Sequence, residues 1–286
     1  FYGANLNGVN FYNSDLVDAY FGNVIISNVD FSETSLTKTQ LYSTASYKNK
    51  DLQGVGLGNL DLTEWDFSGQ NLANTSFNDS TITRADFSDA KNFTSDNLYS
   101  TVNYKNKDLQ GINFARNNLT DFNFSGQNLA NASFNDSTIA GANFSAAKNF
   151  TSDMLYSTAS YKNKDLQGVG LGNLELNGWD FSGQNLANAS FNDSIIKGTD
   201  FSDANLTCAD FSSPNPLIDV DFSRANLTNA DFSNGFLSSS RLDDAIIKGA
   251  IFEKCNMTEE QLYSTASYKN KDLQGINFAR NNLTDF

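Results

Sequence analysis

The side chains that most often carry out chemistry are scarce in this 286-residue sequence. Histidine is absent, which removes the commonest general base and every Ser-His or Cys-His nucleophile pair. The two cysteines, Cys208 and Cys255, cannot build a zinc site without histidine and are too few for a disulfide scaffold. No phosphate loop, G-x-S-x-G motif or dinucleotide fingerprint occurs. We therefore predict no catalytic, cofactor-binding or metal-binding residues, and expect that the protein is not an enzyme.

Carboxylates are the main reactive groups that remain. The chain has 33 acidic and 19 basic residues, which gives a formal net charge of −14. Outer rows of Asp could bind Ca²⁺, but no Asp-x-Asp-Gly loop supports such a site. The negative charge argues against direct nucleic-acid binding and is compatible with solubility, cation binding or an acidic decoy. The longest aliphatic run is Val24–Ile26, so no membrane span is predicted.

Large apolar residues recur at every fifth position along almost the whole chain. The first nine are Phe1, Leu6, Phe11, Leu16, Phe21, Ile26, Phe31, Leu36 and Leu41. Each is typically preceded by a small residue and then Asp or Asn, and followed by Ser or Thr, as in Ala85-Asp86-Phe87-Ser88. A period of five fits neither a helix nor a strand, but it fits a chain that turns a corner every five residues. Four sides then close a square coil, with Asp, Asn, Ser and Thr outside and bonded to the turns.

These positions resemble the pentapeptide-repeat family, whose pattern is A-(D/N)-L-x-x. Ala4-Asn5-Leu6, Ala85-Asp86-Phe87-Ser88 and Ala225-Asn226-Leu227-Thr228 match it directly. The resemblance covers nearly the whole chain and implies an all-β solenoid, a right-handed quadrilateral β-helix. We expect residues 1–286 to form one continuous β-helix of this kind with short inserted α-helices. The resemblance implies much less about function, because this fold carries several roles.

A longer repeat of 57 residues is superimposed on the repeat of five. The string Leu-Tyr-Ser-Thr divides the chain into residues 41–97, 98–154, an expanded 155–261 and a partial 262–286. Residues 104–122 and 268–286 are identical. Such fidelity indicates either recent duplication or a requirement for regular assembly.

Each copy of Leu-Tyr-Ser-Thr follows a helix start signal. Thr258 with Gln261, and Thr37 with Gln40, are capping-box patterns. A short α-helix that replaces part of one coil is therefore predicted in each copy, with an irregular loop as the alternative. The predicted helices cover residues 258–268, 37–47, 94–104 and 151–161.

The spacing of the copies also predicts on which face each helix emerges. The last spacing exceeds the others by 107 − 57 = 50 residues, which is ten repeats of five, or two and a half coils. The fourth helix should then lie opposite the third. Pro214 and Pro216 could change this count, because proline lacks a backbone donor.

Lysine clusters in the repeated string Tyr-Lys-Asn-Lys. A positive ridge beside each helix could pair with the acidic face of a neighbouring molecule. Alternatively, these lysines are solvated turn residues that keep an edge from aggregating. The residues concerned are Lys48, Lys50, Lys105, Lys107, Lys162, Lys164, Lys269 and Lys271.

Four aromatic residues occupy a position that is normally small and inward-facing. They are Trp65, Phe122, Trp179 and Phe286, each at the same place in the long repeat. If their rings turn outward, the row could stack on sugars or on a partner. If they turn inward, they pack beneath the inserted helices.

Two further features of the sequence concern modification. Asn-x-Ser/Thr glycosylation patterns arise from the repeat itself, and the Asn should point outward. Cys255 occupies a small inward position and Cys208 an outward one, so we expect inert packing for the first and an exposed thiol for the second. Examples of the Asn patterns begin at Asn118, Asn205, Asn226 and Asn282.

Three classes of function remain. The favoured class is a non-catalytic structural or scaffolding solenoid, as a segment of an extracellular fibre or surface protein. The second is an acidic, DNA-mimicking binder of a topoisomerase, a role that some proteins of the resembled family have; the net charge fits it and the lysines oppose it. The third is a carbohydrate- or surface-binding adhesin that uses the aromatic row.

The same classes imply the partners and the location. We expect self-association, end to end or lateral, or binding to another protein, with a glycan as a further ligand and no direct nucleic-acid binding. The location is expected to be extracellular or at the cell surface, with the cytoplasm as the alternative. Because the sequence begins at Phe1 without Met or a signal peptide, we expect it to be a segment of a longer or processed protein.

Overall fold

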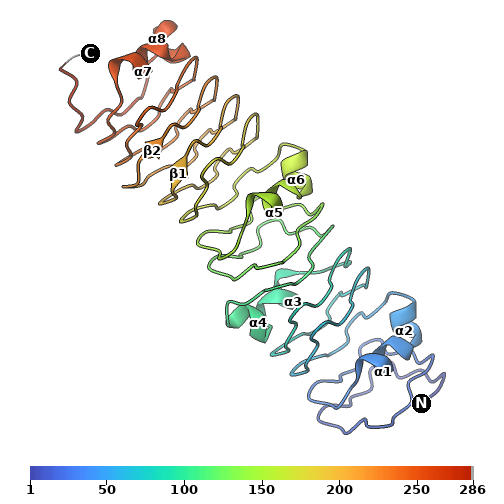
Figure 1. Cartoon of the computed structure of the whole chain (residues 1–286). Helices are drawn as coiled ribbons and strands as arrows, with labels where there is room; N and C mark the ends of the chain where they lie inside the picture. The colour runs from blue at the N-terminus through green and yellow to red at the C-terminus, as the bar shows by residue number, and fades with distance from the viewer. Residues whose placement is uncertain (285–286) are drawn as a thin grey trace. The chain divides into compact units, whose positions relative to one another are not determined.

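The structure is a computed structural model that describes residues 1–284, so Phe286 of the aromatic set lies outside the described residues. Stacked four-sided coils make up each of two compact units (Figure 1). Unit 1 comprises Phe1–Leu119, Gln127–Thr138 and Lys148–Phe150; unit 2 comprises Thr120–Gly126, Ile139–Ala147 and the described residues from Thr151 onward.

Each side of a coil pairs in parallel with the same side of the next coil. Asn5 pairs with Ile25, twenty residues later. The Leu6 N–H donates to the Ile25 carbonyl (N···O 2.9 Å), and the Ile25 N–H donates to the Ala4 carbonyl (3.0 Å). These two bonds recur on side after side, so the coils are joined by a backbone ladder, as the repeat of five predicts.

A tight turn at every corner explains the residues between the large apolar ones. After Phe11, the Ser14 N–H donates to the Phe11 carbonyl at 2.9 Å, and Asn13 between them has φ 55°. Asn, Asp and Gly occupy most such positions, because they adopt positive φ at the lowest cost. The Tyr12 N–H donates to Oδ1 of Asn10 at 2.7 Å. The predicted bonds from Asp and Asn side chains to the turns are therefore confirmed.

The interior of each unit is filled by columns of large apolar side chains. Phe211 stacks between Phe191 and Phe232, with ring centroids 4.7 and 5.0 Å away and planes within 6°. Phe201 and Phe222 meet the same ring nearly edge-on, at interplanar angles of 88° and 87°. The inside of a coil thus has room for one large side chain per side, in contact with the sides above, below and next to it.

The two prolines alter one corner of unit 2. Six residues instead of five separate Phe211 from Leu217, and Asp200 pairs with Asp221, 21 residues later. Beside this corner the ladder lengthens into two short strands that pair in parallel, β1 (Ile196–Lys197) and β2 (Leu217–Ile218). The proline insertion therefore adds one residue to a coil and leaves the stack intact.

Helices occur in all four predicted places, but each is a pair of short helices instead of one. Thr44 ends the first helix and begins the second in an extended conformation (φ −67°, ψ 153°). Its hydroxyl donates to the Leu41 carbonyl and accepts from the Tyr47 N–H, so one threonine caps both helices. The pairs are α1 (Lys38–Ser43) and α2 (Ala45–Lys48), α3 (Ser95–Tyr99) and α4 (Val102–Lys105), α5 (Ser152–Tyr156) and α6 (Ala159–Lys162), and α7 (Glu259–Ser264) and α8 (Ala266–Lys269).

The predicted capping boxes are present at the two sites that have glutamine. The Gln40 side chain accepts from the Thr37 N–H at 2.8 Å, while the Gln40 N–H donates to the Thr37 hydroxyl. Thr258 with Gln261 repeats the arrangement. At Thr151 only the threonine half of the box forms, because Met154 has no oxygen to return the bond.

The prediction that the fourth helix lies opposite the third was wrong. In unit 2, ladder bonds place the segments that follow both helix pairs on one side of the coil, so α5/α6 and α7/α8 occupy the same corner. That side runs through Leu166, Leu186, Leu206, Leu227, Ile247 and Leu273. The 107-residue spacing contains twenty sides, which are five whole coils.

The error came from treating the 57-residue spacing as a return to the same corner. In unit 1, α1/α2 precede Leu52, which lies on the side of Leu72, whereas α3/α4 precede Leu109, on the side of Ile82. These sides face each other across the coil. The 57-residue spacing is thus two and a half coils and moves the helix pair to the opposite corner (Figure 1).

Removing one ring from a phenylalanine column should destabilise the fold. Phe211 is 1% exposed, so Phe211→Ala is expected to lower the free energy of unfolding by about 3–5 kcal/mol through lost contacts and the cavity left behind. Leucine occupies the equivalent inward position in other coils. Phe211→Leu should therefore lower the free energy of unfolding by less than about 1.5 kcal/mol. Urea denaturation followed by circular dichroism measures both, and equal losses for the two variants would contradict the column.

Candidate functional site

The helix pairs are held against the next coil by two stacked tyrosines. Tyr42 and Tyr47 stack with ring centroids 4.1 Å apart and planes 16° apart. The Asp66 N–H donates to the Tyr42 hydroxyl, and the Tyr47 hydroxyl donates to the Asp66 carbonyl at 2.8 Å. The two rings therefore bind both backbone groups of one residue in the following coil.

The same contact recurs in unit 2. The Asp180 N–H donates to the Tyr156 hydroxyl at 2.6 Å, and the Tyr161 hydroxyl donates to the Asp180 carbonyl at 2.8 Å. We call each arrangement a clasp: the tyrosine pair, the lysine after the second helix, and the six-residue coil segment that they hold. The held segments are residues 65–70 in the first clasp and 179–184 in the third.

Trp65 and Trp179 belong to the clasps and do not form an outward row. They are only 6% and 8% exposed, and each meets the first tyrosine of its clasp edge-on at 6.3 Å. Phe122 is likewise 6% exposed. For Trp65 and Trp179, packing beneath the inserted helices is confirmed. All three described rings are buried, so the outward row is wrong for them. The tyrosine pair covers the tryptophan ring on the side that faces the helices.

A buried glutamine completes each clasp, and sequence reasoning missed it. The Gln70 side-chain amide donates to the Tyr47 carbonyl at 3.1 Å, and Gln70 is fully buried. Gln127 and Gln184 donate to Tyr104 and Tyr161 in the same way. The recurring string Ser-Gly-Gln-Asn, in step with the 57-residue repeat, was the available signal. The Tyr47 carbonyl also accepts from the Lys50 N–H at 3.0 Å, so the glutamine adds a side-chain donor to the end of the second helix.

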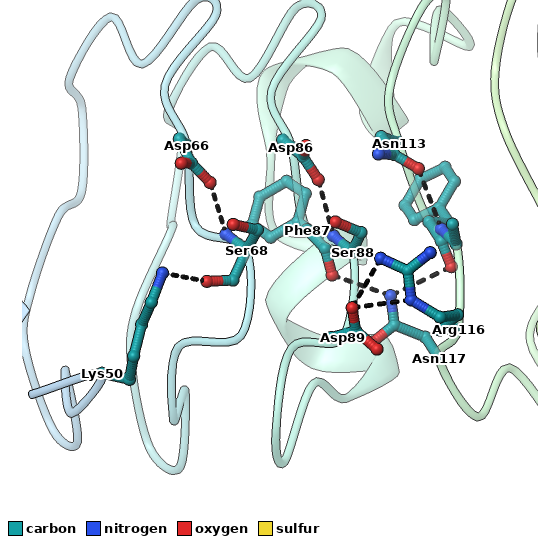
Figure 2. Close-up of polar contacts among 12 residues, drawn as sticks. Lys50, Asp66, Ser68, Asp86, Phe87, Ser88, Asp89, Asn113, Arg116 and Asn117 are labelled. Atoms are coloured by element: carbon teal, nitrogen blue, oxygen red, sulfur yellow. Dashed lines mark hydrogen bonds and ion pairs between the residues drawn. The ribbon is translucent and has the colours of Figure 1, made fainter.

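The repeated lysines bind groups of their own chain. Lys50 has φ 59°, and its ammonium donates to the Ser68 carbonyl at 2.6 Å while lying 5.7 Å from the Tyr47 ring (Figure 2). Lys105 and Lys269 form ion pairs with Asp79 and Asp244 at 2.6 and 2.7 Å. These lysines bond to groups of the neighbouring coil, so the part of the positive ridge that they form is engaged within the chain.

Charged and polar pairs also join coils outside the clasps. Arg116 pairs with Asp89 at 2.6 Å, which lowers the pKa of the Asp89 carboxyl (Figure 2). Both side chains are about half exposed, so the pair contributes little to stability. The Asn117 amide, which is buried, donates to the Phe87 and Phe114 carbonyls at 2.8 and 3.0 Å.

The cysteines and the Asn-x-Ser/Thr sites lie where their positions in the repeat place them. Cys255 is 1% exposed and burial raises the pKa of its thiol to about 12, whereas Cys208 is exposed in an outer turn. Asn118 and Asn282 are exposed, and Asn226 accepts from the Thr228 N–H at 3.1 Å. Within residues 1–284, no group of three or more Cys, Asp or Glu side chains is close enough to hold a metal ion. No helix in that range has the length and apolar character to cross a membrane.

Deleting one clasp hydroxyl should weaken the contact between helix pair and coil. Tyr47→Phe removes the bond to the Asp66 carbonyl and is expected to cost about 0.5–1.5 kcal/mol in urea denaturation. Tyr20→Phe, at a ring that is 62% exposed, is the matched control and should leave the midpoint unchanged. If both variants behave alike, the hydroxyl contact makes no contribution to stability.

The clasps should also make the protein sensitive to alkali. Burial raises the pKa of Tyr104 from 10.0 to about 12, and burial raises the pKa of Tyr47 and Tyr161 as well. Because the folded state favours the neutral phenol, this stabilisation is complete below about pH 10 and is lost as the pH rises towards 12. Urea midpoints measured across that range should fall, and Tyr104→Phe should reduce the slope. A pH-independent midpoint would contradict the assignment.

Comparison with known proteins agrees with the repeat. A family model described as Pentapeptide repeats matches eight copies within residues 14–44, 51–91, 108–145, 165–203, 185–213 and 221–258. No curated protein matches the sequence.

Solved structures with related repeats are only distantly similar. HetL, a pentapeptide repeat protein involved in heterocyst differentiation regulation from the cyanobacterium Nostoc sp. strain PCC 7120, is 17% identical over 93% of this chain and 90% of its own, with a TM-score of 0.28. QnrB1, a plasmid-mediated fluoroquinolone resistance protein, is 18% identical over 78% of this chain and 89% of its own, with a TM-score of 0.25. Rfr23, from the cyanobacterium Cyanothece 51142, is 18% identical over 65% and 95%, with a TM-score of 0.17.

Proposed function

This chain belongs to the pentapeptide-repeat family, and on that premise we propose that it is a non-catalytic structural scaffold. Its fold is the right-handed quadrilateral β-helix of that family. In each unit the scaffold carries two helix pairs among the described residues, at corners set by the number of coils between them. We propose further that it forms a segment of an extracellular fibre or surface protein.

The observation that carries the proposal is how the polar groups of the coils are used. Outward Asp and Asn side chains accept from the backbone two residues on, as Asp86 does from Ser88 at 2.8 Å (Figure 2). Others continue from coil to coil, as Asn71 donates to Asp51 at 2.9 Å and accepts from Asn92 at 2.8 Å. Polar side chains that bond along the stack support a structural role, because a reaction site needs them to converge on one point.

The native full-length protein tests the location and the architecture together. Electron microscopy at moderate salt is expected to show fibres or a surface layer, and antibodies against this segment should label intact cells without permeabilisation. Labelling that requires permeabilisation would overturn the extracellular assignment. Discrete soluble particles in the cytoplasm would overturn the fibre and favour a binding role.

The acidic, DNA-mimicking binder of a topoisomerase is the second candidate, and the net charge of −14 is what favours it. Mixing the chain with purified gyrase tests it, since such a complex should form at low salt and weaken as salt screens the charges. No complex at low salt would remove this candidate. The carbohydrate-binding adhesin depended on outward-facing aromatic side chains. Trp65 and Trp179 are buried, so that argument for an adhesin no longer holds.

A further inference from the structure

We propose that one side of unit 2 binds the same side of a second copy of this chain, with the two stacks of coils running in opposite directions. This contact deepens the proposed scaffold function, on which it rests, by naming a partner and a surface. Three observations carry it: a strip of exposed apolar side chains on an otherwise polar exterior, two exposed charges without a partner in the described chain, and a two-fold register that matches both.

The surface is the side of unit 2 that contains β1 and β2 (Figure 1). Its ladder joins four successive coils, by pairing Glu175 with Ile195, Ile196 with Leu217, and Pro216 with Phe236. In the last three coils the outward residue before the inward centre is apolar, and we call Ile195, Pro216 and Phe236 the apolar strip. Ile195 is 47% exposed and Phe236 40%, and Pro216 is exposed as well. With coils about 4.8 Å apart, the three side chains form one continuous surface.

The apolar strip departs from the outer surface of the other copies of the long repeat. Thr81 and Thr138 hold the place of Ile195 in the two earlier copies, since 138 − 81 = 57 and 195 − 138 = 57. The Thr138 hydroxyl donates to Oδ1 of Asn118 at 2.9 Å, which continues the polar bonding from coil to coil. Ile195 replaces that bond with apolar area in water. Such area is stabilised when a partner covers it, which is why contiguous exposed apolar surface marks interaction sites.

Lys197 and Asp219 border the apolar strip, in the coils of Ile195 and Pro216 respectively. Both are exposed. Among residues 1–284 neither side chain forms an ion pair or a hydrogen bond, in contrast to the charged pairs that join coils elsewhere, such as Arg224 with Asp203 at 2.6 Å. Their charges are therefore available to a second molecule that brings the opposite charge to each.

An antiparallel arrangement with Pro216 on the two-fold axis matches the apolar strip with itself. Pro216 then lies against Pro216 of the other copy, and Ile195 against its Phe236, because these two residues lie one coil to either side of the axis. If the stacks ran in the same direction, Ile195 would meet Lys197 instead, and the apolar side chains would face polar ones. The antiparallel register therefore removes more apolar area from water.

The same register matches the charges. Lys197 of each copy lies within one coil of Asp219 of the other copy, so two positive and two negative groups meet near the axis. Glu175 meets Asn256 of the other copy, which is uncharged. Because one surface serves both molecules, the contact is isologous and closes as a pair. Pairs of this kind would join scaffold chains side by side.

The contact between two isolated chains should be weak. Four coils at a spacing of about 4.8 Å span about 14 Å, which is short for a standard interface of about 800 Å² per partner. Each chain also has a net charge of −14, which opposes the approach of two copies. We therefore expect a Kd of about 0.1–1 mM at moderate salt, where the repulsion is screened beyond about 8 Å.

Threonine substitutions test which side makes the contact. Ile195→Thr restores the residue of the two earlier copies, and Phe236→Thr changes the coil that should face it. Ile246→Thr is the matched control, because Ile246 is 44% exposed on another side of unit 2. In sedimentation equilibrium up to about 2 mM, the wild-type chain and the control should dimerise alike, and each strip variant should raise the Kd at least about 10-fold. Wild-type chains that stay monomeric, or equal effects of Ile195→Thr and Ile246→Thr, would overturn the proposal.

Disulfide cross-linking tests the register, in chains where Cys208→Ser removes the exposed thiol. Pro216→Cys should cross-link to itself. A mixture of Ile195→Cys and Phe236→Cys chains should cross-link, whereas Ile195→Cys alone should not, because two copies of that residue would lie about two coils, roughly 10 Å, apart. Ile195→Cys that cross-links to itself, or a mixture that does not cross-link, would contradict the antiparallel register.

Failure of this contact and failure of the proposed function are distinguishable. Native fibres or a surface layer, together with a chain that stays monomeric at about 2 mM, would remove only the lateral contact. Native protein found inside cells would overturn the extracellular scaffold, whatever the cross-links show.

Discussion

The backbone ladder between successive coils is the interaction on which the rest of the structure depends. Each side offers the next coil one carbonyl and one N–H at fixed places, so every coil must return to the same register. That requirement imposes a corner every five residues and a positive φ at most corners, which Asn, Asp and Gly provide. It also limits the interior to one large side chain per side, and the phenylalanine columns are the consequence.

The ladder also explains why the helix pairs do not disrupt the fold. Each pair is inserted at a corner, and the sides on both of its flanks keep their ladder bonds to the neighbouring coils. The clasp then provides hydrogen bonds where the insertion interrupts the ladder. Tyrosine hydroxyls bind the N–H and the carbonyl of Asp66, and the Gln70 amide donates to the Tyr47 carbonyl. The 57-residue repeat is therefore a structural unit, because helix pair and held segment must recur together.

The sequence by itself determined the coil, its inward and outward positions and the sites of the helices, because a repeat of five and a capping box are local patterns. Thr37 with Gln40 could be read as a helix start without knowing any neighbour. Only the tertiary structure decided that Trp65 turns inward, that Gln70 closes the clasp, and that α5/α6 and α7/α8 share a corner. Those outcomes depend on which residues meet across successive coils. That alignment depends on how many sides each insertion occupies, which a local sequence pattern does not show.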